Sequence, residues 1–240
     1  MNICKNCNEP IDGNFCANCG QPTKQKRIDK NYLIREIKEF FSTNKGLIYT
    51  VKKVAVNPGE SVRRFIAEDR HRFVKPITFL FIASLIYAIV SSLFNVSATD
   101  FFEQPDDALE TSIGTFISNW TIENPGYSNL IIGFLMAFWM RLFFKKSGYN
   151  LFEIFILLCF VMGIMTLLST VGIVVRGLTN FNILYLIIVE MIYLTWAVGQ
   201  FFDKKKASSY VKAFLAYACG LFVMMILIAV VTAIEYAIRH

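Results

Sequence analysis

The chain has 240 residues, of which 55% are hydrophobic, 15% aromatic and only 18% charged. Soluble domains usually contain about a quarter charged residues, so this composition argues against a soluble enzyme. The apolar residues are concentrated after Pro76, whereas most of the 24 Lys and Arg residues precede it. This asymmetry predicts a membrane protein with several spans and an N-terminal region in the cytoplasm.

Residues 1–22 contain four of the six cysteines, in the pairs Cys4/Cys7 and Cys16/Cys19. Two Cys-x2-Cys pairs separated by a short connection match the ligand spacing of a closed four-sulfur zinc site. We therefore predict a small zinc ribbon in which these four cysteines bind a structural zinc ion. Two disulfides are the alternative, but a cytoplasmic segment is kept reduced, which favours zinc.

Residues 23–75 form a basic segment in which apolar residues recur at helical spacing, for example Val62, Phe65 and Ile66. Amphipathic helices with a basic rim often lie on the anionic lipids of a membrane surface. Alternatively, their apolar faces pack on one another or on the spans. Nucleic-acid binding is not expected, because the preference of Lys and Arg for the cytoplasmic side of a membrane already explains the charge.

A resemblance to a known family is carried by residues of this first third of the chain. They are the Cys-Lys-Asn-Cys…Cys-Ala-Asn-Cys-Gly-Gln ribbon of residues 4–21, Arg27-Ile28, Lys45-Gly46-Leu47 with Thr50, Pro58-Gly59, Arg64-Phe65-Ile66, Arg70 and Lys75-Pro76. Together they resemble an uncharacterised family of bacterial integral membrane proteins, a domain of unknown function. That family typically has Gly-Lys-Arg where this chain has Glu68-Asp69-Arg70. The resemblance implies a bacterial inner membrane and supplies no activity.

Five apolar stretches are long enough to cross a hydrocarbon core of about 30 Å as helices. They lie at about 77–96, 128–144, 151–175, 181–202 and 211–238. None shows the alternation of a strand, so helices are the spanning structure. The predicted fold class is therefore all-α: a polytopic helical membrane protein with about five transmembrane helices in residues 76–240 and a small N-terminal zinc ribbon.

The charges of the connecting segments predict the orientation, because Lys and Arg stay on the cytoplasmic side. Residues 145–146 and 204–206 are lysines, whereas residues 97–129 contain six acidic residues and no basic one. We therefore predict a multi-pass protein of the inner membrane with its N-terminus in the cytoplasm and its C-terminus outside.

Two features are predicted at the outer interface. An apolar stripe in residues 104–122, which includes Trp120, predicts a short helix that either lies on the membrane surface or caps the bundle. Arg176 and Glu235 both fall near this interface, and we predict a structural ion pair between them.

Glu190 lies near the middle of the fourth predicted span. Ionisable residues at this depth are rare and are candidates for function. Glu190 is either a carboxylate that couples to a proton, an ion or a substrate, or a neutral side chain hydrogen-bonded between helices by Thr166, Ser169 or Tyr193.

No catalytic motif is present, and the two histidines are His71 and His240. We therefore expect a non-enzymatic membrane scaffold or interaction protein whose zinc ribbon docks or stabilises a cytoplasmic assembly. Its expected partners are the lipid bilayer, anionic lipids in particular, and a cytoplasmic protein. The alternative is a small transporter or channel that uses Glu190 as its coupling group. The sequence does not predict an oligomeric state.

Overall fold

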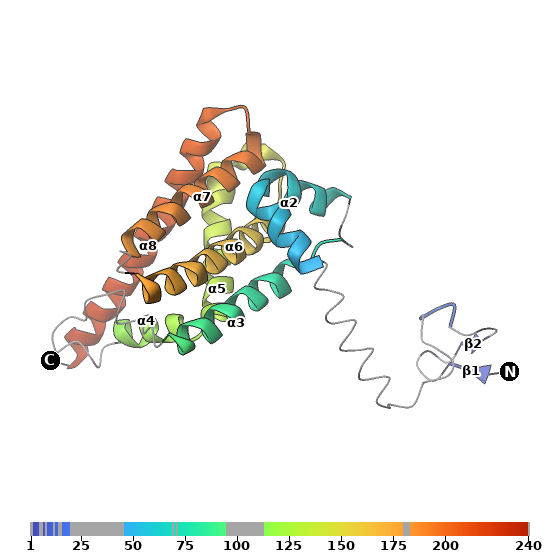
Figure 1. Ribbon diagram of the computed structural model, residues 1–240, viewed down its shortest axis with the longest axis horizontal. Helices are drawn as coiled ribbons and strands as arrows, with labels where there is room; N and C mark the ends of the chain where they lie inside the picture. Colours follow the sequence, from blue (N-terminus) through green and yellow to red (C-terminus); the bar gives the residue numbers. More distant parts are fainter. Residues whose placement is uncertain are drawn as a thin grey trace. The chain divides into compact units, whose positions relative to one another are not determined.

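The structure is a computed structural model (Figure 1). It describes residues 2–4, 7, 9–11, 13, 16–19, 46–68, 70, 72–94, 113–179 and 183–239. The chain divides into two compact units, Met1–Lys45 and Gly46–His240. Residues 46–75, predicted as a juxtamembrane segment, therefore belong to the same compact unit as the spans.

The first unit contains a short antiparallel hairpin. Strand β1 (Asn2–Ile3) pairs with β2 (Pro10–Ile11), with Asn2 opposite Ile11 and Ile3 opposite Pro10. The Cys4 N–H continues this pairing by donating to the Glu9 carbonyl at 2.9 Å. Residues 23–45 lie outside the described residues, and so do the helical patterns predicted there.

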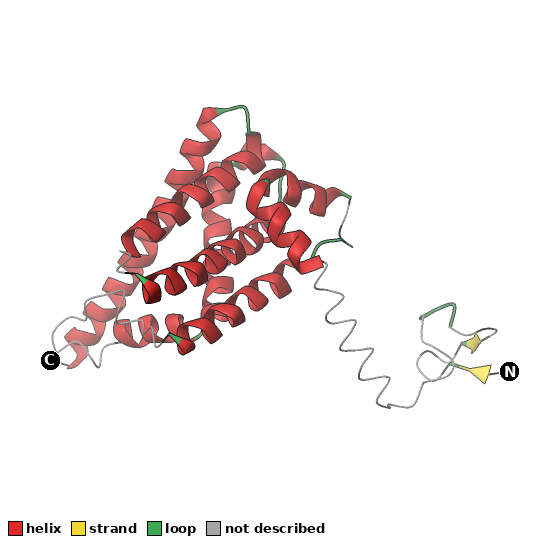
Figure 2. Cartoon of the chain, viewed as in Figure 1, coloured by secondary structure: helices red, strands yellow, loops and turns green. Residues whose placement is uncertain are grey.

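All the regular secondary structure among the described residues of the second unit is helical, with short loops between the helices (Figure 2). Its helices are residues 46–56, α2 (Pro58–Ala67), α3 (Pro76–Leu93), α4 (Ile113–Glu123), α5 (Pro125–Phe143), the 3-10 turn η3 (Lys145–Ser147), α6 (Leu151–Leu178), α7 (Ile183–Asp203) and α8 (Ala207–Arg239). Five of them, α3 and α5 to α8, are long and apolar enough to cross a membrane. The predicted all-α polytopic fold with about five spans is confirmed.

The helices begin where the sequence supplies start signals. Pro58, Pro76 and Pro125 each occupy the first turn of a helix, where the N–H that proline lacks would have no partner. A capping box begins α6: the Glu153 N–H donates to Asn150 Oδ1 at 2.9 Å, and the Asn150 N–H donates to Glu153 Oε2 at 2.8 Å. This capping box satisfies two backbone N–H groups at the start of α6.

Helix α6 lies at the centre of the bundle and packs against α2, α3, α5 and α7. In the most apolar 18-residue stretch of α6, half of the residues are buried, whereas only 11% are buried in the corresponding stretch of α8. The outward side chains of the outer helices are largely apolar, for example Leu85 and Ile89 on α3 and Phe222 and Met225 on α8. Such a surface suits contact with lipid rather than water.

Residues 46–68 fold back onto the spans. Val54 and Val62 are fully buried, and Phe65 packs edge-on against Phe160 of α6. Of the two alternatives for the amphipathic helices, these residues therefore adopt packing on the spans. The connections at 144–150 and 204–206 lie at the same end of the bundle as α2, and we call it the basic end because they carry five lysines. Helix α4 lies at the opposite end (Figure 1).

Candidate metal centre and intramembrane cavity

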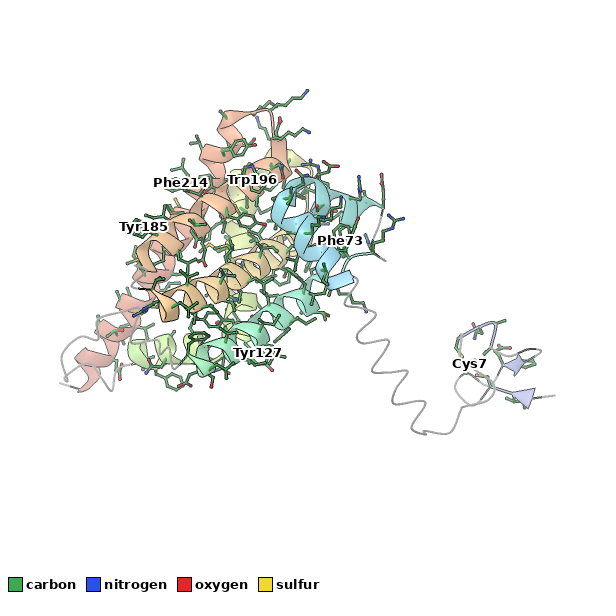
Figure 3. The ribbon with its side chains drawn as sticks, viewed as in Figure 1. Cys7, Phe73, Tyr127, Tyr185, Trp196 and Phe214 are labelled. Atoms are coloured by element: carbon green, nitrogen blue, oxygen red, sulfur yellow. The ribbon has the colours of Figure 1, made fainter. Side chains whose placement is uncertain are left out.

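The four predicted zinc ligands lie together in the first unit. The Sγ atoms of Cys4, Cys7, Cys16 and Cys19 are all within 4.8 Å of one another, and Cys7 is labelled in Figure 3. The pairs Cys4–Cys19 and Cys7–Cys16 are each 3.5 Å apart. A tetrahedral metal with sulfur bonds of about 2.3 Å would hold its sulfurs about 3.8 Å apart, so the cluster could bind a metal ion.

The chemistry of the thiols also fits a metal centre. All four are free rather than joined in disulfides. Backbone hydrogen bonds from the Cys19 and Asn18 N–H groups lower the pKa of Cys16. A hydrogen bond from the Glu9 backbone lowers the pKa of Cys7, but desolvation and the three neighbouring thiols outweigh it and raise this pKa to about 12. Four thiolates this close repel one another, and a divalent cation between them removes that repulsion.

A partly open cavity of about 230 Å³, with both polar and apolar side chains in its lining, lies between the helices of the helical unit, towards the opposite end. It is lined by Tyr87 of α3, Thr121 of α4, Pro125, Ser128 and Asn129 of α5, Met162, Met165, Thr166 and Ser169 of α6, and Glu190 of α7. Glu190 is the one ionisable carboxyl group among these lining residues, and none of them is basic. A volume of this size holds several water molecules or a small solute.

Glu190 is hydrogen-bonded and also lines the cavity. Ser169 Oγ donates to Glu190 Oε1, which joins α6 to α7. Of the three predicted partners, Thr166 lines the same cavity and accepts a hydrogen bond from Asn129 Nδ2 at 3.2 Å. The Tyr193 hydroxyl donates instead to the Val54 carbonyl, at 2.9 Å.

Sequence reasoning missed the other polar groups of this cavity, Tyr87 and Asn129 among them. A usable signal was present: Thr166, Ser169 and Thr170 recur at three- to four-residue spacing, so they share one face of α6. A stripe of hydroxyl groups on an otherwise apolar span marks the face that meets polar partners on neighbouring helices.

The predicted features of the outer interface are seen in part. Within the predicted stretch 104–122, the described helix is α4, which packs against α5 and α8. Its Phe116 is 69% exposed, so α4 contacts the bundle and also presents an apolar side chain outward. Glu235 Oε2 accepts a hydrogen bond from the Ile113 N–H, which joins α8 to the start of α4. The ion pair between Arg176 and Glu235 stays a prediction.

A further site, also missed from the sequence, joins α2 to the end of α7 at the basic end. The Gly59 N–H donates to Gln200 Oε1 at 2.8 Å. One guanidinium nitrogen of Arg63 donates to the carbonyls of Gln200 and Phe201, at 2.7 Å each. These carbonyls are in the last turn of α7, and the Gly59 N–H is in the first turn of α2. Side chains of each helix therefore supply partners for backbone groups at the end of the other.

The contact at this junction requires glycine at position 59. A Cβ atom there would lie 2.5 Å from the backbone of Gln200 and Phe201. Backbone atoms cannot rotate away as the tip of a side chain can, so any larger residue separates α2 from α7. The neighbouring Arg64, by contrast, is exposed and pairs with Glu60 at 3.5 Å.

Phenylalanines from four segments meet between α2 and α6. The ring of Phe160 on α6 lies 5.2 Å from that of Phe65, 6.3 Å from that of Phe73 and 5.8 Å from that of Phe79. Phe73 (labelled in Figure 3) is in the connection between α2 and α3. That connection is also held by Thr50, whose Oγ1 accepts from the Val74 N–H at 3.0 Å.

The fold and the sites thus define a polytopic α-helical membrane protein with an N-terminal four-cysteine cluster. A family model described as a protein of unknown function (DUF3667) matches residues 44–88. No curated protein and no solved structure matches the chain. The predicted resemblance to a family of unknown function is confirmed over this segment. The match covers the residues that fold back onto the bundle, including Gly59, Arg63 and the three phenylalanines that surround Phe160.

Proposed function

We propose that this protein is a non-enzymatic membrane scaffold, in which five spans anchor a zinc ribbon that docks a cytoplasmic protein assembly. The observation that carries this proposal is the four-cysteine cluster, which lies in a compact unit of its own, Met1–Lys45. A folded metal module outside the helical unit is suited to contact a second protein.

Zinc is the ion that suits the cluster best. Zn²⁺ favours tetrahedral coordination by thiolates, and four cysteines satisfy it completely. A site filled in this way has no position left for a water molecule or a substrate, so the ion is structural. Its binding free energy is then folding energy for the ribbon.

In this proposal the basic end and the N-terminus face the cytoplasm of a bacterial inner membrane. The lysines at 145–146 and 204–206 gather at one end of the helical unit, and positively charged connections remain on the cytoplasmic side. The reducing cytoplasm also keeps the four thiols available for a metal.

The experiment that tests the docking function compares partners captured from membranes by the tagged full chain. The test variant combines Cys4→Ser with Cys16→Ser, and the matched control is Cys219→Ser, which changes a cysteine of α8. We expect one zinc ion per chain and a specific cytoplasmic partner for the parent and the control, and neither for the test variant. An unchanged set of partners on the zinc-free variant would contradict the docking role.

A second candidate function, transport or channel activity, is favoured by the cavity around Glu190. A carboxyl group in a partly open cavity at membrane depth, with no basic residue among the lining residues, can exchange a proton or attract a cation. Ser169, which donates to it, would position the carboxyl group.

Proton flux into proteoliposomes tests this second function. We expect Glu190→Gln to reduce pH-driven flux at least tenfold, because the amide cannot carry a proton, and Ser169→Ala to reduce it less. Glu153→Gln is the control, since Glu153 caps α6 and does not line the cavity. Equal flux for the parent and Glu190→Gln would leave Glu190 a structural residue.

A further inference from the structure

An apolar groove of about 290 Å³ runs between residues 46–56 and α3. Leu47 and Val51 form one wall, and Phe79, Ile82 and Ile86 form the other. A side chain of the central helix α6, Leu167, also lines it. The groove is therefore part of the surface of the helical unit but is deeper than a simple helix face.

The groove follows the half of α3 that is nearer the basic end. Helix α3 begins at Pro76, and the groove follows it from Phe79 to Ile86. Seven residues of helix correspond to about 10 Å. One leaflet contributes about 15 Å of hydrocarbon to a bilayer. The groove thus begins near the basic end of the span and ends near its middle, as one acyl chain of that leaflet does.

The positive charge of this groove lies close to the start of α3, because Thr50, two residues before Lys52, is hydrogen-bonded to the Val74 N–H just ahead of that helix. Lys52, exposed, is its one charged lining residue. Lys75, also exposed, precedes Phe79 by one helical turn, so it lies on the same face of α3. None of the described residues that line the groove is acidic. The charge therefore lies where the phosphate of a lipid would be if its chain occupied the groove.

We propose that this groove is a binding site for one anionic phospholipid, with an acyl chain along α3 between Phe79 and Ile86 and the phosphate at Lys52. The apolar walls separate the acyl chain from the surrounding lipids. The ammonium group of Lys52 favours a negatively charged headgroup. This site is independent of the docking function, because it uses only the helical unit.

Native mass spectrometry of the full chain tests the headgroup preference. The protein in mild detergent receives equal amounts of phosphatidylglycerol and phosphatidylcholine with identical chains. We expect one phosphatidylglycerol to be retained preferentially, and Lys52→Gln to reduce this preference about fivefold, the effect of one lysine near an anionic headgroup. Lys53→Gln removes the same charge from the next residue, which lies over the Tyr49 ring rather than in the groove, and should leave the preference unchanged.

Two tryptophan variants test the acyl-chain position. Ile86→Trp fills the groove and should lower retention of both lipids roughly tenfold, about the loss of two buried methylenes. Ile89→Trp adds the same bulk to an exposed position of α3 outside the groove and should not. The proposal is overturned if Lys52→Gln keeps the parental preference, if Lys53→Gln loses it equally, or if the two tryptophan variants retain lipid alike at equal thermal stability.

Discussion

The two compact units of this chain specify their structures by different means. Among the described residues of the first unit, the buried side chains are Cys4 and Cys16, and its strands have two residues each. The helical unit buries a continuous core around α6 and joins its helix ends by side chains. A module with so little core depends on a metal ion, whereas the helical unit depends on packing. Each unit should therefore fail under a treatment that leaves the other intact.

Removing the metal should have the largest effect. A strong zinc chelator, or Cys16→Ser, is expected to unfold the first unit completely, because structural zinc contributes on the order of 10 kcal/mol to such modules. The thermal midpoint of the helical unit, followed by circular dichroism, should not change. Limited proteolysis before residue 46 reports on the first unit. A lowered midpoint of the helices would show that the two units stabilise each other.

Gly59→Val should be the most damaging single change in the helical unit. The added side chain meets the backbone of Gln200 and Phe201 at 2.5 Å, so we expect a loss of about 3 kcal/mol in the free energy of unfolding. Gly46→Ala is the matched control. Its Cβ would have ordinary contacts, at 3.6 Å from the Arg72 carbonyl oxygen, and the helix should gain rather than lose stability. Equal losses for both would mean that α2 does not dock closely on α7.

Arg63→Ala should cost somewhat less, about 2 kcal/mol in the free energy of unfolding. This is the usual contribution of hydrogen bonds from a charged group, here to the carbonyls of Gln200 and Phe201. Denaturation of the purified protein in detergent measures the difference. The zinc content should equal that of the parent, because the cysteines are in the other unit. If zinc were lost together with stability, the two units would not be independent.

Arg64→Ala should have the smallest effect, below about 0.5 kcal/mol. Its partner Glu60 is 3.5 Å away, and both side chains are about half exposed to solvent, where ion pairs contribute little. The same denaturation experiment compares the free energies of unfolding of Arg63→Ala and Arg64→Ala, which remove the same charge from neighbouring positions. A loss for Arg64→Ala as large as for Arg63→Ala would remove the special role of the α2–α7 junction.

The features that sequence reasoning predicted are local ones. Each span is visible as a continuous apolar stretch, and the four-cysteine cluster follows from the spacing of Cys4, Cys7, Cys16 and Cys19. Local patterns place the ends of a helix less well than its middle. The third span was expected to end at about residue 175, but α6 continues through Arg176 and Gly177 to Leu178. At about 42 Å, this helix is longer than the hydrocarbon core that it crosses.

The features that sequence reasoning missed depend on helices that are distant in the chain. The cavity around Glu190 is lined from α3 to α7, so no single stretch of sequence describes it. Arg63 and its acceptor Gln200 are separated by 137 residues. Arg63 and Arg64 are indistinguishable in the sequence. Only the packing of α2 on α7 shows that Arg63 makes a partly buried contact while Arg64 stays exposed to solvent.

The junction between α2 and α7 also has a consequence for how the protein is made. Ribosomes add about 5–20 residues per second, so Arg63 exists for on the order of ten seconds before Gln200 is synthesised. During that interval α3, α5 and α6 enter the membrane, while Val62 and Phe65 of α2 have no complete surface on which to pack. The junction therefore joins an early segment of the chain to a late one.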